Sequence, residues 1–549
     1  METNDSFSKI MTTDNIISIA LSRTTFEMEL MKSPVLSEII TQMPKLPFEE
    51  IKREEMILHN DENKLKRIRD GKEEEVCPTV SVSEKYIYIN RALSTVADKI
   101  GSGIANLYGE LYYYNRSRWI NMSEQTASNF ISIIAQKAGL YNSFVSNFKV
   151  KKNMYMQLNA DLLVSDEMIN ASVTEFMAIV NLRNGTIKIS EDGEVILHPF
   201  SKNDYLRYQL EYDYDPTATC PMFDKFLDEV LPEKAAQDLL MEMIGYCFIP
   251  TQKMKLERSL MLYGPGANGK GVVFDIVVSI LGEEHVSGFS MDALSHDANA
   301  RAQLKDKLLN YATELGGKCN PDMIKKLISG EPVHVKTLYK DVTMMKNYSC
   351  KFIFNTNALP RGAENTNAFF RRWEILPFDV EIPSEKRDIH LSKKLKTELS
   401  GIFNRVLDGI KRLIKNKDFT KSELSTKMLE EYKFQSNSVF RFITEEEWIP
   451  TVDKNDDSKI SSEIQHVSLK EFYKTYENYC NESGCPSNSK LDFGKKIRQY
   501  FKVQEKCTNN ETWVFAKSEK VLITLKRPTD SSLDLSNDII NQVMNDEQL

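Results

Sequence analysis

A glycine-rich run in the middle of the chain has the residue types and spacing of a phosphate-binding loop. It reads Gly264-Pro265-Gly266-Ala267-Asn268-Gly269-Lys270. Glycines let backbone N–H groups converge on nucleotide phosphates, and the lysine adds a full positive charge. The next residue is Gly271, where such loops usually carry the Ser or Thr whose hydroxyl binds Mg²⁺. We therefore predict that these residues bind ATP, that Mg²⁺ relies on phosphate oxygens, water and a carboxylate, and that binding survives better than turnover.

Polar residues at the ends of two later apolar runs could complete an ATPase site. The run Leu308 to Glu314 ends in an acid, and Lys351 to Phe354 is followed by Asn355 and Asn357. A carboxylate at a strand end can polarise the attacking water or hold Mg²⁺ through water, and an amide can donate to the γ-phosphate. We predict Glu314 as a catalytic and metal-binding residue and Asn357 as a sensor, with Asn355 the weaker candidate. Turn-forming asparagines and a surface glutamate are the alternatives.

Two adjacent arginines, Arg371 and Arg372, precede the apolar run Trp373 to Phe378. In an ATPase that assembles as a ring, an arginine can reach the γ-phosphate held by the neighbouring subunit and stabilise the transition state. We predict both arginines as candidate catalytic residues, of which one would act in this way, and a pair of surface charges is the alternative.

These residues need a sheet flanked by helices, and the apolar pattern predicts both. The run Ser259 to Tyr263 is short, apolar and ended by Gly264, as in a buried strand, and Val272 to Leu281 is helix-like. Upstream, apolar residues from Phe223 to Leu231 recur at helical spacing, and a second helix runs through Leu239 to Ile244. A strand, a glycine-rich loop and a helix in this order form the setting in which such a loop binds phosphate.

The region ahead of this core has a mixed pattern. A helix is expected from Ala127 to Ala138, and a hairpin from Thr186 to Ser190 and Glu194 to Leu197, with Gly193 in its turn. The stretch Phe48 to Glu75 alternates charges of both signs, which indicates an exposed helix or a linker.

After residue 425 the pattern predicts a small DNA-binding unit. Two short helices, around Leu469 to Tyr476 and Leu491 to Tyr500, precede the run Lys502 to Lys517, as in a winged helix-turn-helix. Ser487 or Ser489 could cap the second helix. A plain helical tail is the alternative. The residues expected to face DNA are Lys490, Lys495, Lys496 and Arg498.

Composition restricts the class of protein. The 549 residues are 41% hydrophobic and 27% charged, as in globular domains with sizeable cores. The formal net charge of −8 means that DNA contacts must come from local basic patches. Among eight cysteines, the only close pair is Cys480 and Cys485, without the second pair that a zinc site needs. Because a signal peptide and a bilayer-spanning run are missing from the pattern, we expect a cytoplasmic location, in a bacterium or wherever the DNA replicates.

The order of phosphate-binding loop, Glu-ended strand, Asn-ended strand and arginine pair resembles a superfamily 3 helicase. The chain is most similar to the phage and plasmid primase-helicase group that also contains the poxvirus primase-helicase. Gly271 departs from the family pattern. The sequence segments that carry the resemblance are Gly245 to Cys247, Tyr263 to Lys270, Lys325 to Glu331, Asn355 to Pro360 and Phe370 to Phe378. Three shorter segments before them also resemble the family: Asn184-Gly185, His198-Pro199 and Tyr214 to Pro216.

The resemblance implies a hexameric ring that threads single-stranded DNA and unwinds in the 3′ to 5′ direction. It also implies a hairpin that projects a basic tip into the pore, for which Lys336, Lys340 and Lys346 are the candidate DNA contacts. Exposed lysines without a DNA partner are the alternative. Some family members carry an N-terminal primase, but residues 1–85 are too few for one, so we expect no primer synthesis by this chain and a separate primase as partner.

Together these patterns predict an α/β protein with a P-loop, AAA+-like ATPase core built on a parallel sheet, preceded by a mostly helical domain and followed by a winged-helix domain. The predicted function is an ATP- and Mg²⁺-dependent DNA helicase that acts on single-stranded and forked DNA in replication of a phage, virus or mobile element. The alternatives are an ATP-binding initiator ring with little hydrolysis and the helicase part of a primase-helicase. The predicted boundaries are 1–85, 86–220 (helical or mixed), 221–425 (ATPase), 426–528 (winged helix) and 529–549 (acidic tail).

Overall fold

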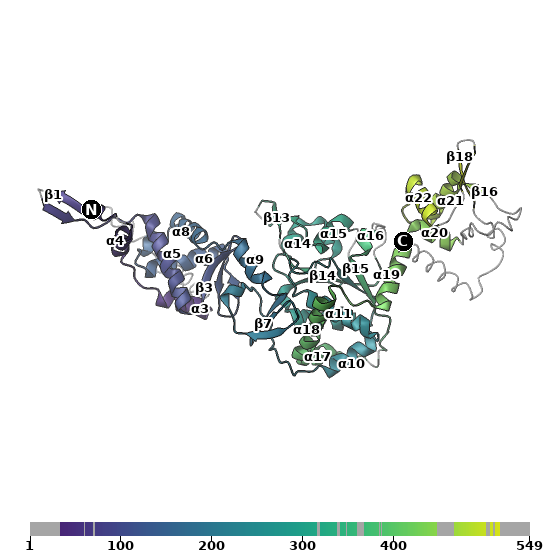
Figure 1. Ribbon diagram of the computed structural model, residues 1–549, viewed down its shortest axis with the longest axis horizontal. Helices are drawn as coiled ribbons and strands as arrows, with labels where there is room; N and C mark the ends of the chain where they lie inside the picture. Colours follow the sequence, from purple (N-terminus) through teal and green to yellow (C-terminus); the bar gives the residue numbers. More distant parts are fainter. Residues whose placement is uncertain are drawn as a thin grey trace, which may run out of the picture.

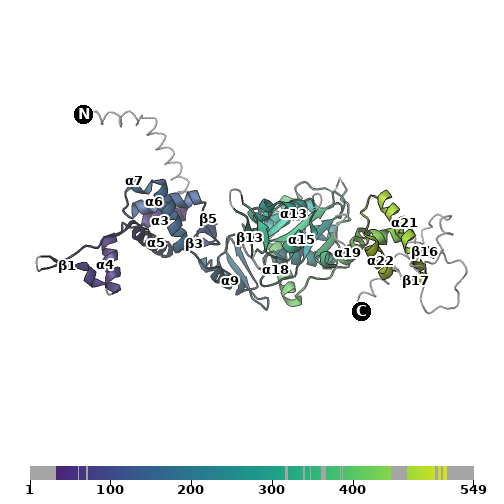
Figure 2. The same cartoon turned by 90° about the horizontal axis from the view of Figure 1, so that it is seen from above.

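The computed structural model describes most of the chain between residues 33 and 515. Three parts follow one another along the long axis: an N-terminal part, a large central part around a parallel sheet, and a small C-terminal part (Figures 1 and 2). The described residues are 33–59, 61–69, 72–315, 319–337, 341–346, 348–359, 367–383, 385, 387–446, 466–500, 505–508 and 511–515.

The N-terminal part combines helices with short antiparallel strands. Apolar residues of α3, α5, α6 and α8 share one core, and a capping box between Ser81 and Glu84 starts α5. Because α3 packs into this core and α5 runs across residues 85 and 86, the folded unit starts before our predicted boundary. The elements are α3 (Pro34–Gln42), α4 (Phe48–Leu58), β1 (Lys66–Arg69), β2 (Lys72–Glu75), α5 (Val82–Lys99), β3 (Gly103–Leu107), β4 (Glu110–Tyr114), β5 (Trp119–Asn121), α6 (Glu124–Lys137), α7 (Asn142–Val145), α8 (Phe148–Asp161) and α9 (Asp166–Thr174).

A second antiparallel sheet joins this part to the central one. It consists of β6 (Ala178–Leu182), β7 (Gly185–Ile189) and β8 (Val195–His198), in that order. The predicted helix is confirmed as α6 and the predicted hairpin as β7–β8. With β3–β5 and β6–β8 in place, the region before residue 221 is mixed rather than mostly helical, since aromatic and β-branched residues fill these strands.

The central part is built on a sheet of five strands that all run parallel, in the order β10-β11-β14-β9-β15. The prediction of an α/β protein with a parallel sheet is confirmed. The elements are α10 (Pro221–Val230), α11 (Lys234–Tyr246), β9 (Ser259–Tyr263), α12 (Lys270–Leu281), β10 (Val286–Ser287), α13 (Met291–His296), α14 (Ala298–Ala302), β11 (Leu309–Ala312), α15 (Pro321–Ile328), β12 (Val333–Val335), β13 (Thr343–Met345), β14 (Lys351–Thr356), α16 (Asn367–Phe370), β15 (Trp373–Pro377), α17 (Leu391–Leu395), α18 (Leu399–Asn416) and α19 (Glu423–Ser436).

Both faces of the parallel sheet are covered. In β9, Leu260 and Leu262 join the core formed with α11, α12 and α18, whereas Met261 joins the core formed with α13, α15 and α19. This alternation follows from the two-residue period of a strand and explains why β9 is apolar throughout. Because Tyr432 of α19 lies in the second core, the central unit continues past residue 425, our predicted boundary.

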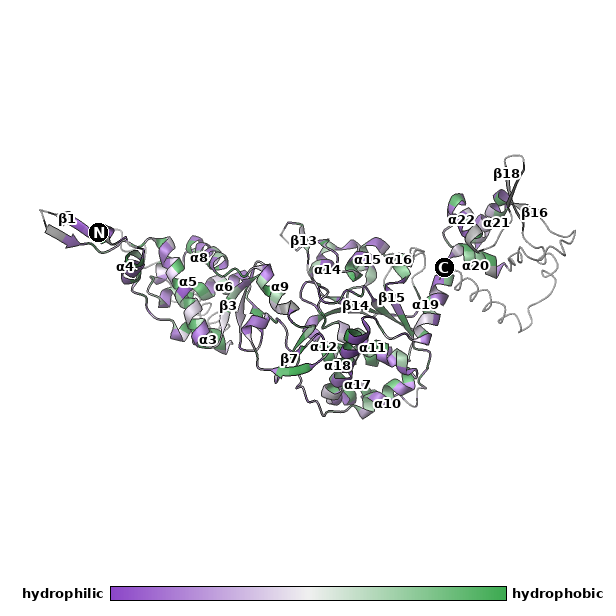
Figure 3. Cartoon of the chain, viewed as in Figure 1, coloured by the Kyte–Doolittle hydropathy of each residue, from purple (hydrophilic) through white to green (hydrophobic). Residues whose placement is uncertain are grey.

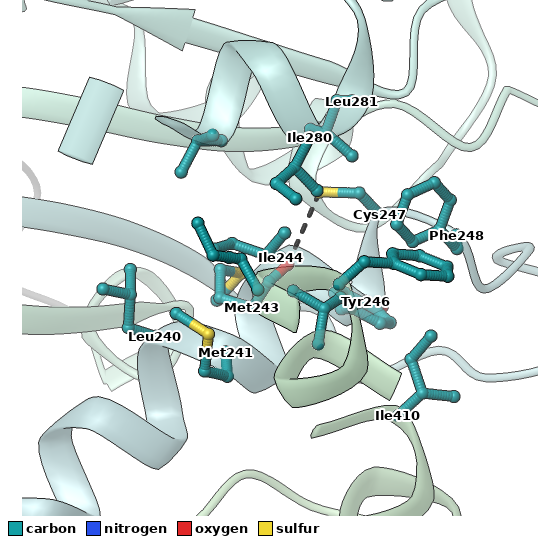
Figure 4. Packing of buried hydrophobic residues seen from close by; sticks show 14 of the residues in the cluster. Leu240, Met241, Met243, Ile244, Tyr246, Cys247, Phe248, Ile280, Leu281 and Ile410 are labelled. Carbon is teal, nitrogen blue, oxygen red and sulfur yellow. Dashed lines mark hydrogen bonds between the residues drawn. The ribbon is translucent and has the colours of Figure 1, made fainter. Parts of the chain in front are cut away.

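The first of these cores contains a close helix pair, α11 and α18 (Figure 4). A Cβ atom on Gly409 of α18 would lie 2.9 Å from backbone atoms of Met241 and Glu242 in α11, so the contact requires a residue without a side chain. Helices such as α10 carry apolar residues on one side and polar residues on the other, as the alternating colours of Figure 3 show.

The C-terminal part has its own aromatic core, in which Phe442, Tyr476 and Phe493 meet. Its sheet has the order β16-β18-β17 and is antiparallel. Its elements are α20 (Ser438–Glu445), β16 (His466–Ser468), α21 (Leu469–Glu482), α22 (Lys490–Tyr500), β17 (Glu505–Thr508) and β18 (Glu511–Phe515). In the described part of the chain, none of the helices is long and apolar enough to cross a membrane.

Candidate functional site

The glycine-rich loop connects β9 to α12, as the sequence predicts. Lys270, the first residue of α12, is buried, and its ammonium group donates to Gly264 O at 2.6 Å, Pro265 O at 2.9 Å and Asn268 Oδ1 at 3.0 Å. Burial lowers the pKa of Lys270 below its ordinary value. The lysine is thus held inside the curve of the loop, where it can exchange these oxygens for those of an anionic ligand.

The loop is also fastened to the end of a neighbouring strand. Asn268 donates from Nδ2 to the carbonyl oxygen of Phe378 at 2.6 Å, directly after β15, and Ile382 N donates to Ala267 O at 3.1 Å. Gly264 has φ of +154°, and a Cβ atom there would come within 2.4 Å of Phe378 O. The close approach of the loop to this strand end therefore requires glycine at position 264.

The open side of the loop fits a phosphate group. No side chain caps α12, so its first N–H groups remain available to an anion, and the partial positive charge of the helix N-terminus adds to that of Lys270. A Cβ atom on Gly266 or Gly271 would meet no heavy atom within 4 Å, which leaves room beside the loop at both positions.

The part of the chain that the structure describes offers no preformed Mg²⁺ site. Among the described residues, no group of three or more His, Cys, Asp or Glu side chains lies close enough to hold a metal. Gly271 contributes no oxygen ligand from a side chain, so the donor set suits a cation that keeps several waters and binds mainly through the nucleotide, as Mg²⁺ commonly does.

Glu314 and Asn357 lie at the same edge of the sheet as the loop, because all three follow the carboxyl ends of parallel strands. The strand β11 ends at Ala312, so Glu314 lies two residues beyond it, whereas the sequence predicts a strand that continues to the acid. Glu314 and Asn357 are both exposed. Their position suits side chains that approach a ligand bound by the loop.

The two asparagines of the Asn355-Thr356-Asn357 run have different surroundings. Asn355 is buried within β14, and its Oδ1 accepts a hydrogen bond from Tyr311 OH at 2.9 Å. Asn357 lies just outside the strand, exposed. The geometry therefore favours Asn357 over Asn355 as the residue that can turn toward a ligand.

Arg371 and Arg372 lie at the opposite edge of the sheet, before the amino end of β15. Arg372 is buried and donates to Ser329 Oγ from Nε at 3.1 Å and from Nη2 at 2.8 Å. Arg371 is 61% exposed, and its Nη2 atom lies 3.3 Å from Oε2 of Glu257. The structure thus separates a fixed arginine from an exposed one, both at the sheet edge opposite the loop.

Glu257 was not singled out from the sequence, yet it contacts both arginines: its Oε2 lies 3.2 Å from Nη2 of Arg372 as well. The residue precedes β9, and β9 pairs with β15 from Ser259 opposite Trp373. An acid just before one strand and a basic pair just before its parallel neighbour are the signal that could have identified this contact, once the strand order was known.

The predicted basic hairpin is formed by β12 and β13, with Val335 opposite Thr343. Lys336 follows β12 at the distal end and is exposed, whereas Lys346 is exposed at the base, directly after β13. Lys340 lies outside the described residues. Of the two described lysines, Lys336 is therefore the one near the tip.

In the C-terminal part, Ser489 accepts from Asp492 N at 3.2 Å and so caps α22, one of the two residues predicted for this role. Lys495 is exposed, whereas Lys496 is half-buried near Asn488 Oδ1, at 3.4 Å, and burial lowers its pKa. Arg498 belongs to α22, but its side chain lies outside the described set. Lys490, the first residue of α22, is exposed too, so Lys490 and Lys495 are better placed than Lys496 to meet a ligand.

Two family models match parts of the chain. Residues 104–232 match a family described as "D5 N terminal like", and residues 262–372 match a family of unknown function, DUF5906. The first match supports a relationship to phage primase-helicase-like replication proteins. The second covers the loop, Glu314, Asn357 and both arginines, so these residues lie within one recognised sequence unit.

Solved structures with a similar trace include apo forms of the NrS-1 C-terminal region. One is 13% identical and covers 77% of this chain and 98% of that chain, with a TM-score of 0.44. Another is 12% identical and covers 79% and 99% of the two chains, with a TM-score of 0.41. Values this low say nothing of what the chain does.

Proposed function

We propose that this chain is an ATP-hydrolysing, ring-forming DNA helicase of the superfamily 3 type, acting in replication within the phage primase-helicase-like group. The observation that carries the proposal is the loop between β9 and α12, with Lys270 buried inside it and Glu314 and Asn357 at the same sheet edge. The strand order, with the loop strand between β14 and β15, is the one expected of an AAA+-like core.

Each residue of this edge has a role in the proposed reaction. Lys270 and the first N–H groups of α12 would hold the phosphates, and Glu314 would orient and polarise the attacking water. Asn357 would donate to the phosphate oxygens as a sensor. Bound ATP with Mg²⁺ supplies the phosphoryl group and neutralises part of its charge.

The proposed trans arginine is Arg371. Its side chain is exposed at the sheet edge opposite the loop, so it is suited to a neighbouring subunit rather than its own. Arg372, bound to Ser329 and Glu257, would support the backbone that carries Arg371. This arrangement supports a ring, and the hexamer implied by the resemblance is its proposed form.

DNA contacts are proposed at two places. The β12–β13 hairpin carries Lys336 near its tip and Lys346 at its base, with Lys340 between them in sequence. The order α20, β16, α21, α22, β17, β18, with β18 in the middle of its sheet, supports a winged-helix unit whose α22 would face DNA through Lys495, Lys496 and Arg498. Both surfaces would bind phosphates with strong salt dependence.

The test is the rate of ATP hydrolysis with and without single-stranded DNA, measured for the unaltered chain and for Lys270→Ala and Glu314→Gln. We expect Lys270→Ala to lose nucleotide binding, and Glu314→Gln to bind nucleotide but hydrolyse it about 100-fold or more slowly. Glu283→Gln, the same change at an exposed position before β10, serves as the control and should keep full activity. Hydrolysis that survives Lys270→Ala would contradict the proposal.

A second candidate is favoured by Gly271: an ATP-binding assembly ring that hydrolyses little and recruits a separate primase or other replication proteins. Without the hydroxyl, metal geometry depends more on water, which affects turnover more than binding. Rings that form with bound nucleotide, together with no hydrolysis by the unaltered chain, would select this candidate over the helicase.

A further inference from the structure

A long stretch of the N-terminal part, between the first residue of α6 and the last of α8, contains no acidic residue. Between Glu124 and Asp161 the sequence contains no Asp or Glu but carries Lys137, Lys149, Lys151 and Lys152. The chain as a whole has a formal net charge of −8, so this stretch is an exception to its overall charge. Local positive charge of this kind is what an acidic protein needs to attract a polyanion.

Large apolar side chains are exposed on the same stretch. Tyr141 is 83% exposed, Phe148 is 77% exposed and Met156 is 58% exposed. The other side of α8 is well packed, since Met154 and Leu158 are buried in the N-terminal core. Poor packing of α8 therefore does not explain the exposure of these side chains.

The spacing brings the two kinds of side chain together on α8. Phe148, Lys152 and Met156 are separated by four residues each and so share one face of the helix, and Lys149 is exposed next to Phe148. Tyr141 precedes α7, which packs beside α8. Aromatic rings interleaved with lysines form the pattern by which proteins bind unpaired nucleotides, through stacking and phosphate contacts.

We infer that the α7–α8 face, made of Tyr141, Phe148, Lys149, Lys152 and Met156, is a second binding surface for single-stranded DNA. Phe148 and Tyr141 stack on unpaired bases, and Lys149 and Lys152 contact the phosphates. Single-stranded rather than duplex DNA fits because paired bases offer no open ring faces to exposed side chains. In Figure 1, α8 lies on the upper side of the N-terminal part, and the β12–β13 hairpin lies on the upper side of the central part.

This inference deepens the proposed function, on which it rests for the choice of DNA as ligand. It requires neither ATP hydrolysis nor a ring, because the whole face belongs to one subunit. Its test is therefore the affinity of the full chain for a fluorescent oligothymidylate in the absence of nucleotide. Fluorescence anisotropy measures this affinity at a series of salt concentrations.

Three variants of the face are compared with the unaltered chain. Tyr141→Ala with Phe148→Ala removes both rings and is expected to weaken binding about tenfold or more. Lys149→Ala with Lys152→Ala is expected to weaken binding and to reduce the slope of log affinity against log salt by about 1.4. Phe148→Tyr keeps a ring and should bind as the unaltered chain does.

The matched control is Lys415→Ala with Lys427→Ala, which removes two exposed lysines from α18 and α19 and should leave affinity and slope unchanged. Unfolding curves establish that the variants fold. Unchanged DNA affinity in both double variants would overturn the inference, and so would a change in oligomeric state alone, which would mean that a second copy covers the face. Loss of ATPase activity in Lys270→Ala is independent of either outcome, so failure of the inference and failure of the proposed function remain distinguishable.

Discussion

At the scale of single residues, neighbours in the sequence have unlike roles because their partners come from distant segments. Arg371 and Arg372 are adjacent and chemically identical, yet Ser329 and Glu257 fix one and leave the other largely in solvent. The sequence pattern predicts a functional role for a basic pair just before β15. Which arginine is held by other side chains and which is exposed depends on tertiary contacts and is visible only in the fold.

This division predicts different consequences for the two arginines. Arg372→Ala leaves the buried Ser329 Oγ without its partner, whereas Glu257 keeps Arg371 and Lys255, so it should lower the free energy of unfolding by about 2 kcal/mol. Arg371→Ala removes an exposed group and should leave stability within about 0.5 kcal/mol while reducing ATP hydrolysis strongly. Urea unfolding and ATPase rates measure both effects.

Mixing the Arg371→Ala chain with the Lys270→Ala chain tests the trans arrangement. Mixed rings contain interfaces that pair an intact loop with an intact arginine, so activity should partly return. Activity that stays at the level of the separate variants would place Arg371 outside the neighbouring site.

Gly271 provides a second prediction at this scale. The position is helical and a Cβ atom there meets nothing within 4 Å, so a serine fits without displacing a neighbour. Gly271→Ser should raise the turnover number several-fold if a missing Mg²⁺ ligand limits the rate. The matched control is Gly266→Ser, at the other open position of the loop, and a turnover number that rises equally in both variants would exclude a metal ligand as the cause.

At the scale of elements, the strands that bury both faces are the ones that the sequence predicts well. Ser259 to Tyr263 was predicted to the residue because its apolar run is short and ended by glycine. The strand β11 was predicted too long, since Thr313 and Glu314 follow it without a glycine or proline to mark the end of pairing. The pairing of β9 with both β14 and β15 depends on contacts more than 90 residues apart in sequence, which no local pattern encodes.

A buried lysine at the start of β14 gives a prediction about pH. Lys351 lies 4.2 Å from the ring centroid of Tyr246 and donates to Thr251 Oγ1 at 3.0 Å, and burial lowers its pKa to about 8 from an ordinary value of 10.5. Between these values the unfolded chain holds a proton that the folded chain has released, so the contribution of Lys351 to the free energy of unfolding should rise with pH from about 8 to 10.5. Below pH 8 both states are protonated and the full cost of burying the charge applies.

Lys351→Met should therefore stabilise the protein at pH 7, by on the order of 2 kcal/mol, and remove this rising contribution between pH 8 and 10.5. Burial raises the pKa of the nearby thiols of Cys247 and Cys350, that of Cys247 to about 12, so their contribution to stability falls as pH rises through the window, and it does so in the control variant as well. Urea unfolding at pH 7 and pH 10 measures the effect, with Lys415→Met as an exposed control. An equal pH slope in both variants would contradict the assignment to Lys351.

At the scale of the whole molecule, the chain separates its proposed functions along its length. The nucleotide loop lies in the central part, and the aromatic core around Phe442 and Phe493 belongs to a small part beyond α19. Neither the continuation of the central unit through Tyr432 nor the start of the N-terminal core at Val35 was predicted. Polar helices such as α19 contribute few apolar residues to each core, so their sequence resembles a linker.

The proposed ring gives a prediction at this scale. In the presence of a slowly hydrolysed ATP analogue, light scattering should detect a particle of six times the mass of one chain. Arg371→Ala should weaken this assembly when nucleotide is present and leave it unchanged without nucleotide, because the arginine meets its partner only through the phosphate. A chain that stays monomeric in both conditions would contradict the ring.

The bond from Asn268 to the carbonyl of Phe378 joins the two ends of the proposed chemistry within one subunit. The bond fastens the loop to one end of β15, and Arg371 precedes the other end. The strand β15 thus connects the loop of one proposed site with the arginine proposed to act in the next. In the proposed ring, the direction of β15 would set the sense in which neighbouring sites are connected.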